Sequence, residues 1–288
     1  MIYQLAEEYC RRKLRFAGSR TVVKYRRALD NLKSFLGRDP EITDLQAEVV
    51  LDFLAWFSPG RSPHTVNEAR AKVVALWNYA ARQGLTDVWP DVGKVPAPVR
   101  LPVAWRVDQF RALLDACGKM PGSVAGIPAP DWWRGLLLLG WATGERRTAL
   151  LGFRWADWDP VTHRLIARAE SRKGKDRDRL YQVPGWCARM LVELPRTGPL
   201  ILPWDRSEAL YFHHWNRLLK YAGLPADRWH KTHALRRSHA SHLAAAGVDA
   251  SRALGHSSPL VTYEHYLDPQ IVGAIDHGDR LPDPTRAT

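Results

Sequence analysis

Cysteine is scarce in this sequence of 288 residues, and the three that occur lie far apart at Cys10, Cys117 and Cys187. Their number is odd, and their spacing is not that of ligands to a metal ion. The pattern predicts free thiols in a reducing compartment and gives no support for a disulfide framework.

Long hydrophobic runs are also missing. The longest apolar run, around Leu136 to Leu139, is far too short to span a bilayer, and residues 1–9 are acidic and amphipathic, unlike a signal peptide. We therefore predict a cytoplasmic protein. The sequence contains neither a P-loop nor a cluster of carboxylates suited to Mg²⁺, so no cofactor is predicted.

Acidic side chains are outnumbered by basic ones. Lys and Arg number 42 against 30 Asp and Glu, which gives a net charge of +12 and a pI of about 9.9. Residues 1–98 hold 15 basic and 11 acidic side chains, and residues 99–288 hold 27 and 19. This excess suits nucleic acid or an anionic membrane surface. Because the bases are scattered and form no compact Lys run, nucleic acid is the predicted partner.

Residues 1–87 are predicted to form an all-helical domain. In its second helix an apolar stripe runs along one face. The stripe consists of Val22, Tyr25, Leu29, Leu32 and Phe35. A later helix is predicted to begin at Ser62-Pro63, with Pro in the first turn, and to end at Gly84.

Basic residues on the second and fourth helices can line a surface that faces DNA, and a solvated polar face explains them equally well. They are Arg20, Lys24, Arg27, Arg61, Arg70, Lys72 and Arg82. After these helices, repeated prolines in residues 88–102 prevent a helix and favour an extended linker. Residues 103–288 then form a second domain.

Within that second domain the pattern is again mainly helical. A strongly apolar helix is predicted from Asp131 to Thr143. Residues 163–169 and 178–184 alternate apolar and polar side chains and are predicted to be two strands around a basic turn.

Chemically active side chains gather between His233 and Tyr266. His233 and Arg236 are three residues apart, which places both on one face of a helix. Leu254-Gly255-His256 follows, and Tyr263 and Tyr266 come soon after it. Arg can bind phosphate oxygens with two donors, His can move a proton near neutral pH, and Tyr supplies an oxygen nucleophile. The set is suited to holding a phosphodiester.

A metal site is the alternative for two histidines of this helix. His239 and His242 lie three residues apart, a spacing that can suit a metal ion. No Cys or carboxylate stands at a companion spacing, so we predict no metal site.

The ordered set His-x-x-Arg, Leu-Gly-His and Tyr resembles the C-terminal signature of the tyrosine recombinases, the phage-integrase family. Thr143-Gly144-Glu145-Arg146 is similar to the motif that carries the first catalytic arginine of that family, and the basic turn looks like its β-hairpin. The resemblance implies a mainly α fold. It places a helical, SAM-like core-binding domain at residues 1–87 and an α-rich catalytic domain with a small antiparallel β-hairpin or sheet at residues 103–288.

The resemblance also implies a mechanism without metal or nucleotide. Two arginines clamp the scissile phosphate, one His donates a further hydrogen bond, and a second His assists proton transfer at the nucleophilic Tyr. A hairpin lysine protonates the leaving 5′-oxygen; we choose Lys173, with Lys175 as the competitor. Tyr266 is the nucleophile, with Tyr263 as the fallback. The implied site residues are Arg146, Lys173, His233, Arg236, His256 and Tyr266.

Two features depart from the family pattern. Ala149 stands where the family usually has an acidic residue that braces the first arginine from behind. The segment of residues 247–255 is a few residues shorter than the common version, which bears on the placement of His256.

We therefore expect site-specific DNA recombination, of the integration or excision type, through a covalent 3′-phosphotyrosyl intermediate. The expected partners are a double-stranded recombination site and further copies of the chain in a synaptic tetramer on DNA, with no membrane. The expected location is the cytoplasm, in association with the nucleoid. The alternatives are a DNA-relaxing enzyme of the type IB topoisomerase kind and a catalytically weak DNA-binding regulator of the same fold.

Overall fold

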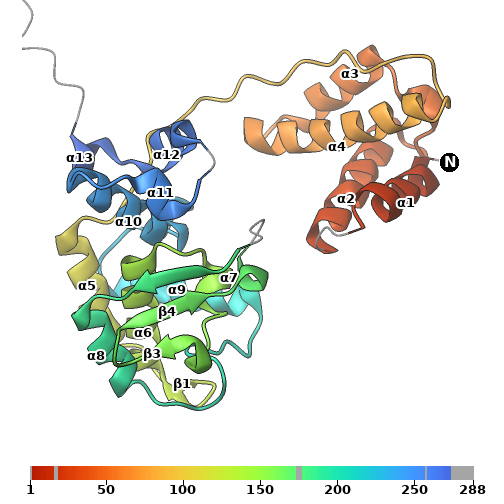
Figure 1. Ribbon diagram of the computed structural model, residues 1–288. Coiled ribbons are helices and arrows are strands. Elements are labelled where there is room, and N and C mark those ends of the chain that lie inside the picture. Colours follow the sequence, from red (N-terminus) through yellow and green to blue (C-terminus); the bar gives the residue numbers. More distant parts are fainter. Residues whose placement is uncertain (1, 16–18, 173–176, 257, 274–288) are drawn as a thin grey trace, which may run out of the picture. The chain divides into compact units, whose positions relative to one another are not determined.

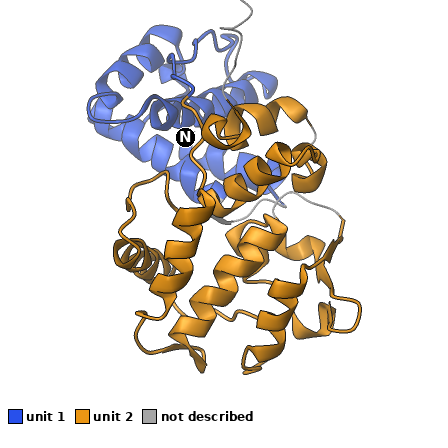
Figure 2. Cartoon of the chain, turned by 90° about the vertical axis from the view of Figure 1, so that its left-hand side faces the viewer, with its two compact units in different colours: residues 1–99 blue, residues 100–288 orange. Residues whose placement is uncertain are grey.

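A computed structural model describes residues 2–15, 19–172, 177–256 and 258–273 of the chain (Figure 1). The residues pack into two compact units, Met1–Val99 and Arg100–Thr288, which Figure 2 shows in separate colours. None of the helices in these described residues combines the length and the apolarity needed to cross a membrane.

All regular elements in the described residues of unit 1 are helices. Its α-helices are α1 (Ile2–Lys13), α2 (Ser19–Leu36), α3 (Ala47–Phe57) and α4 (Pro63–Arg82), and a 3-10 turn, η1 (Ile42–Asp44), precedes α3. The apolar stripe on α2 is confirmed for Tyr25, Leu29 and Leu32, which are buried, and for Phe35, which packs against them. It is wrong for Val22, which is 40% exposed because it lines an open groove between α1 and α2.

The ends of α4 follow from local chemistry, as predicted. The hydroxyl of Ser62 accepts a hydrogen bond from the backbone N–H of Thr65, and Pro63 occupies the first helical position. Just beyond the helix, Gly84 adopts a φ of 68°, a left-handed conformation that glycine takes without steric cost.

The first part of the proline-rich segment 88–102 is held by unit 1. Nε of Arg70 donates to the carbonyl oxygen of Val92 at 2.8 Å, and the side-chain amide of Asn67 bonds both the N–H and the carbonyl of Val95. Val92 is buried. Arg70 therefore fixes the backbone of this segment, a different role from that of a base on a surface facing DNA.

Unit 2 is built around the apolar helix α6 (Ala129–Thr143), whose side chains Trp132 and Trp133 are fully buried with Tyr211 and Trp215. The helix begins two residues before the predicted Asp131, because Pro130 fits its first turn. The other described helices are α5 (Val107–Cys117), α7 (Arg147–Leu150), α8 (Gly185–Glu193), α9 (Glu208–Tyr221), α10 (His233–Ala245), α11 (Ala250–Leu254), α12 (Pro259–Tyr266) and α13 (Pro269–Val272). Of these, α5, α8 and α10 pack against α6.

A small antiparallel sheet lies beside these helices, in the order β3 (Trp158–Asp159), β4 (Arg164–Ala167) and β5 (Arg179–Gln182). The two predicted strands are β4 and β5, each shorter than expected at both ends. The short elements that remain are the hairpin β1 (Ser123–Val124) and β2 (Ile127–Pro128) and the 3-10 turns η2 (Trp155–Asp157) and η3 (Ala169–Ser171). The predicted mainly α fold with a small antiparallel sheet is confirmed.

The three cysteines are free, as predicted. Cys117 and Cys187 are buried, and burial raises the pKa of each thiol to about 12. Both are therefore packing residues and not reactive thiolates near neutral pH.

Candidate active site

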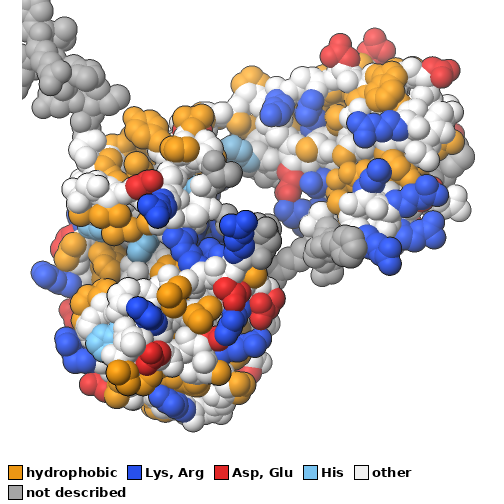
Figure 3. Space-filling model, viewed as in Figure 1, with side chains coloured by type: hydrophobic (Ala, Val, Ile, Leu, Met, Phe, Trp, Pro, Cys, Tyr) orange, Lys and Arg blue, Asp and Glu red, His pale blue; other side chains and the backbone are white. Residues whose placement is uncertain are grey.

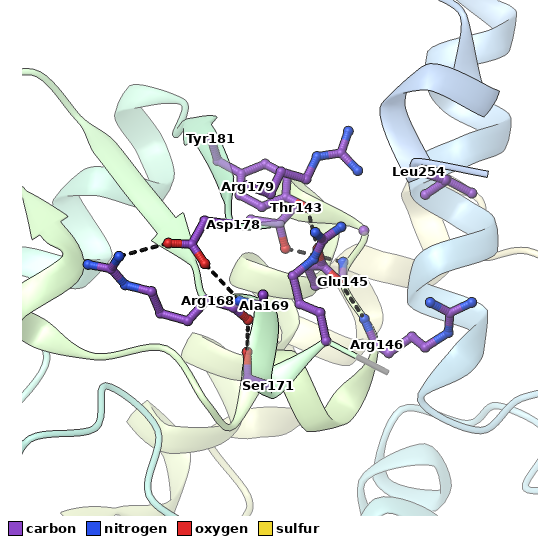
Figure 4. Close-up of polar contacts among 12 residues, drawn as sticks. Thr143, Glu145, Arg146, Arg168, Ala169, Ser171, Asp178, Arg179, Tyr181 and Leu254 are labelled. Carbon is purple, nitrogen blue, oxygen red and sulfur yellow. Dashed lines mark hydrogen bonds and ion pairs between the residues drawn. The ribbon is translucent and has the colours of Figure 1, made fainter. Parts of the chain in front are cut away.

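The loop after α6 begins at Gly144, and only glycine fits there. Its φ of 61° is left-handed, and a Cβ atom would lie 2.5 Å from Cδ2 of His239 on α10. The close approach of α6 and α10 at this point lets the next two residues, Glu145 and Arg146, turn toward α10 before α7 begins. Figure 4 shows the side chain of Arg146 extended toward the C-terminal helices.

Arg236, in the first turns of α10, is 1% exposed and is held by the backbone of two other segments. Its Nη1 donates to the carbonyl oxygen of Gly144 at 2.7 Å, and its Nη2 donates to that of Leu254 at 2.9 Å. Nε of Arg236 is buried and, among the described residues, has no hydrogen-bond partner. The guanidinium is thus fixed in place by carbonyl oxygens of two segments, those that lead to Arg146 and to His256.

His256 follows the left-handed Gly255 that ends α11, and its ring lies between Arg236 and α12. Nε2 of His256 is 3.1 Å from Nη2 of Arg236, and Nδ1 is 2.8 Å from Oγ1 of Thr262. Because a guanidinium only donates, Nε2 is the acceptor, and Nδ1 carries the proton that is donated to Thr262. The short segment 247–255 therefore still brings His256 against Arg236.

Tyr266, the last residue of α12, is 7% exposed and lies among these groups. The centre of its ring is 4.5 Å from that of His256 and 5.3 Å from that of His233, and Cζ of Arg236 is 5.6 Å from it. Tyr263, the fallback nucleophile, is 63% exposed on the same helix.

The backbone around Tyr266 is fixed by one buried hydroxyl of α10. Oγ of Ser241 donates to the carbonyl oxygen of Tyr266 at 3.0 Å and accepts from the N–H of Asp268 at 2.9 Å. The carboxylate of Asp268 in turn accepts from the N–H of Ala104 at 2.8 Å. The end of α12 is therefore attached to α10 and to the start of unit 2.

Charge in the site is dominated by the arginines. Burial lowers the pKa of Arg236, the charge of Arg146 lowers it further, and Tyr266 and Glu145 act in the opposite direction. Burial also lowers the pKa of His233 to about 4, assisted by the charges of Arg237, Arg236 and Arg146. His233 is thus a neutral base near pH 7, in a pocket whose surplus positive charge suits an anion.

Five of the six predicted site residues come together in this part of unit 2. They are Arg146, His233, Arg236, His256 and Tyr266. Lys173 and its competitor Lys175 lie outside the described residues. The residues that flank them, Arg172 and Arg177, are joined by a bond of 2.9 Å from Nη1 of Arg172 to the carbonyl oxygen of Arg177.

One carboxylate at the site was missed from the sequence. Glu145 is 3% exposed and accepts hydrogen bonds from Arg172 on one side and from the hydroxyl of Tyr181, on β5, on another. Figure 4 shows Glu145 between Tyr181 and the part of the chain that carries Leu254. The family motif Thr-Gly-x-Arg does not specify the residue at this position. The acidic side chain directly before Arg146 was therefore the only feature of the sequence that could have indicated a role for Glu145.

The two histidines considered for a metal have other partners. Nδ1 of His239 is 2.8 Å from the carbonyl oxygen of Trp141, and Nε2 of His242 is 3.0 Å from that of Trp105. In the part of the chain that the structure describes, no group of three or more His, Cys, Asp or Glu could hold a metal ion.

Basic side chains also gather on unit 1, as Figure 3 shows on one face. Lys24, Arg27 and Lys72, from α2 and α4, line a pocket of about 120 Å³ together with Glu68. Lys24 forms an ion pair with Glu68, which reduces the local positive charge. A basic surface of this kind can contact DNA phosphates, but such contacts do not by themselves specify a DNA sequence or a reaction.

No protein-family model matches the chain. Over 279 residues the chain is 27% identical to the tyrosine recombinase XerC of Rhodospirillum centenum, a match that covers 88% of this chain and 79% of that protein. Two solved structures resemble it. One is the XerH site-specific recombinase bound to palindromic difH substrate in a post-cleavage complex, with a TM-score of 0.69 and 18% identity over 92% of this chain and 82% of that chain. The other is a lambda integrase tetramer bound to a Holliday junction, with a TM-score of 0.68 and 15% identity over 90% and 78%. The fold is that of these recombinases, and the predicted resemblance is confirmed.

Proposed function

From a chain that has the fold of the tyrosine recombinases and sequence similarity to one of them, we propose site-specific DNA recombination through a covalent 3′-phosphotyrosyl intermediate. The observation that carries this proposal is the position of Tyr266, whose ring lies against His233 and His256 and within 5.6 Å of the guanidinium carbon of Arg236. A phenol, a fixed guanidinium and two imidazoles in one buried pocket are the groups that phosphoryl transfer to a tyrosine requires.

Arg236 and Arg146 bind the scissile phosphate. Because hydrogen bonds to the carbonyl oxygens of Gly144 and Leu254 already hold the guanidinium of Arg236, little reorganisation is needed as charge builds up on the phosphate oxygens. Arg146 lies near enough to lower the pKa of Arg236, and a dianionic transition state relieves that repulsion.

The two histidines take different roles. His233 is neutral near pH 7, so it can accept the proton that Tyr266 loses as its oxygen attacks phosphorus. In this structure Nε2 of His256 accepts a hydrogen bond from Arg236. When a phosphate oxygen accepts that Arg236 hydrogen bond instead, His256 can carry a proton on Nε2 and donate it in a hydrogen bond to the phosphate. Lys173, or its competitor Lys175, protonates the leaving 5′-oxygen.

The two units divide the task of binding DNA. In this proposal residues 1–87 are the core-binding domain, residues 88–102 the linker and residues 103–288 the catalytic domain. The chain acts on a double-stranded recombination site as a synaptic tetramer, in the cytoplasm and at the nucleoid. The lambda integrase tetramer on a Holliday junction supports this arrangement by its fold. A relaxing enzyme and an inactive regulator are not favoured.

Covalent capture tests the proposal and selects the target sequence in the same experiment. The probe is a library of duplexes with randomised arms, nicked beside the scissile position so that the released short strand diffuses away and cleavage cannot be reversed. Protein–DNA adducts that survive denaturation are isolated, and their DNA is sequenced. We expect the wild-type chain to enrich one inverted-repeat sequence in the adduct.

Two matched variants then identify the nucleophile. Tyr266→Phe removes one oxygen and keeps the ring packing, so it should abolish the adduct on the selected sequence while binding is kept. Tyr263→Phe changes an exposed phenol on the same helix and should leave the adduct rate within about twofold. An adduct from Tyr266→Phe refutes the assignment, and binding without any wild-type adduct supports the inactive regulator instead.

A further inference from the structure

This chain has Ala149 in place of the acidic residue of the family pattern, and a different buried carboxylate lies beside the second arginine of the site. Ala149 is 1% exposed, and its methyl group offers no charge to an arginine. Four residues earlier, Glu145 places Oε2 at 4.0 Å from Nη1 of Arg236 and at 3.4 Å from the backbone N–H of Arg146. The carboxylate therefore lies near the guanidinium of Arg236, whereas its contact with Arg146 is to the backbone N–H alone.

The second oxygen of Glu145 faces the sheet. Oε1 accepts from Nε of Arg172 at 2.7 Å and from the hydroxyl of Tyr181 at 2.6 Å. The Arg172 side chain is 7% exposed and also donates to the carbonyl oxygen of Arg177, so it links the two described residues on either side of positions 173–176. The two oxygens of one carboxylate thus face two parts of unit 2 that lie far apart in sequence.

We propose that Glu145 is a positioning residue that braces the guanidinium of Arg236 and couples it to Arg172, which directly precedes the segment with Lys173 and Lys175. This proposal rests on the proposed function, because it assigns the phosphate clamp and the leaving-group acid to the two ends of the connection. Glu145 contacts neither reacting atom and acts through Arg236 and Arg172.

The charge of Glu145 is needed for this role. Burial alone would raise the pKa of the carboxyl, but the hydrogen bond from Tyr181 and the charges of Arg172 and Arg236 outweigh it and lower the pKa. The carboxylate is therefore ionised at neutral pH, where it attracts the two guanidinium groups to fixed positions. A neutral amide of the same size keeps the volume and loses that attraction.

Glu145→Gln is the informative variant, measured by the rate of adduct formation on the captured sequence. We expect the rate to fall about 10- to 100-fold, since small displacements of catalytic groups cost rates of this order. Tyr181→Phe removes one donor and keeps the charge, so its loss should be smaller, about 2- to 5-fold. Asp44→Asn is the matched control, because Asp44 is a buried carboxylate bonded by Arg38 in unit 1.

A second substrate separates the two ends of the connection. In a duplex with a 5′-bridging phosphorothiolate the leaving group is a thiolate, which departs without a general acid. If Glu145 positions the loop lysine, the deficit of Glu145→Gln should shrink several-fold on this substrate. An equal deficit on both substrates overturns the coupling to the loop, and a rate within twofold of wild type overturns the brace. Loss of folding alone would not depend on the leaving group.

Hydrogen exchange of the DNA-free protein tests the role of Glu145 without requiring adduct formation. If the wild-type chain forms no adduct, that result counts against the proposed function and not against this role. In Glu145→Gln we expect faster amide exchange in peptides covering residues 177–183 and 233–241, and unchanged exchange in α5 and α8. Asp44→Asn should alter only peptides of unit 1. Unchanged exchange at 177–183 and 233–241, or a uniform rise throughout unit 2, overturns the proposal.

Discussion

The carbonyl oxygen of Gly144 accepts a hydrogen bond of 2.7 Å from Nη1 of Arg236. The same glycine allows α6 to end against α10 and precedes Arg146 by two residues. The loop that carries the first arginine thus also orients the second, although 92 residues separate the bonded pair. The geometry of the phosphate clamp therefore depends on a residue without a side chain.

Gly144→Ala should be strongly destabilising. The left-handed φ costs about 1–2 kcal/mol for a residue with a Cβ atom, and the clash with His239 adds about 1–3 kcal/mol. Gly223→Ala is the control, since Gly223 has a φ of 67° and no atom within 4 Å of the added Cβ. Urea unfolding of unit 2 should show the larger loss for Gly144→Ala. Equal losses would mean that backbone strain alone explains both.

The stability of unit 2 should fall as the pH is lowered from about 6.5 to about 4. The folded pKa of His233 is about 4, below the ordinary value of 6.5, so between these values the unfolded chain binds the additional proton and unfolding becomes more favourable. The loss of stability caused by this group reaches roughly 3 kcal/mol at the acid end of this window and is absent above pH 6.5. His233→Gln should flatten this part of the stability curve relative to wild type. A parallel curve would contradict the buried, neutral imidazole.

Arg236→Lys should slow adduct formation by about 100-fold or more. A lysine cannot donate to the carbonyl oxygens of Gly144 and Leu254 and also to a phosphate oxygen with the fixed geometry of a guanidinium. Arg237→Lys is the control. Arg237 is also buried, and its Nε donates to the carbonyl oxygen of Val103, so this variant should lose stability with a much smaller loss of rate. Similar rate losses would assign Arg236 a packing role.

Much of this site could be predicted because its residues belong to short local motifs. Arg146 follows a helix end marked by glycine, and His233 and Arg236 lie one turn apart on one helix, so sequence spacing determines their relation. The position of Tyr266 among them could not be predicted from spacing. It depends on α12 packing against α10, through contacts such as that of Ser241.

The role of Glu145 lay beyond the sequence for a related reason. Its partners are Arg172, which follows η3, and Tyr181, on β5, and they lie 27 and 36 residues further along the chain. The absent acid at Ala149 suggested that Arg146 is loosened, whereas the fold brings another carboxylate, Glu145, to the guanidinium of Arg236. Similarly, Arg70 resembled a DNA-binding base until the structure showed its bond to the backbone of Val92.

Two serines on α10 allow the position of Tyr266 to be tested apart from stability. Ser241 and Ser238 are both fully buried and lie three residues apart. Each hydroxyl donates to a carbonyl oxygen and accepts from a backbone N–H: Ser241 bonds Tyr266 and Asp268, and Ser238 bonds Ala234 and Trp105. Ser241→Ala and Ser238→Ala should each cost about 1–3 kcal/mol, because each leaves a buried N–H without its acceptor.

Only Ser241→Ala releases the backbone next to the nucleophile. Its adduct rate should therefore fall about 10-fold at a temperature where both variants remain folded, while Ser238→Ala keeps a rate near that of wild type. Thermal unfolding, followed by tryptophan fluorescence, defines that temperature. If the two variants lost rate in proportion to their loss of stability, the attachment of α12 to α10 would have no separate influence on the reaction, and the position of Tyr266 would have to be set by its ring contacts with His233 and His256.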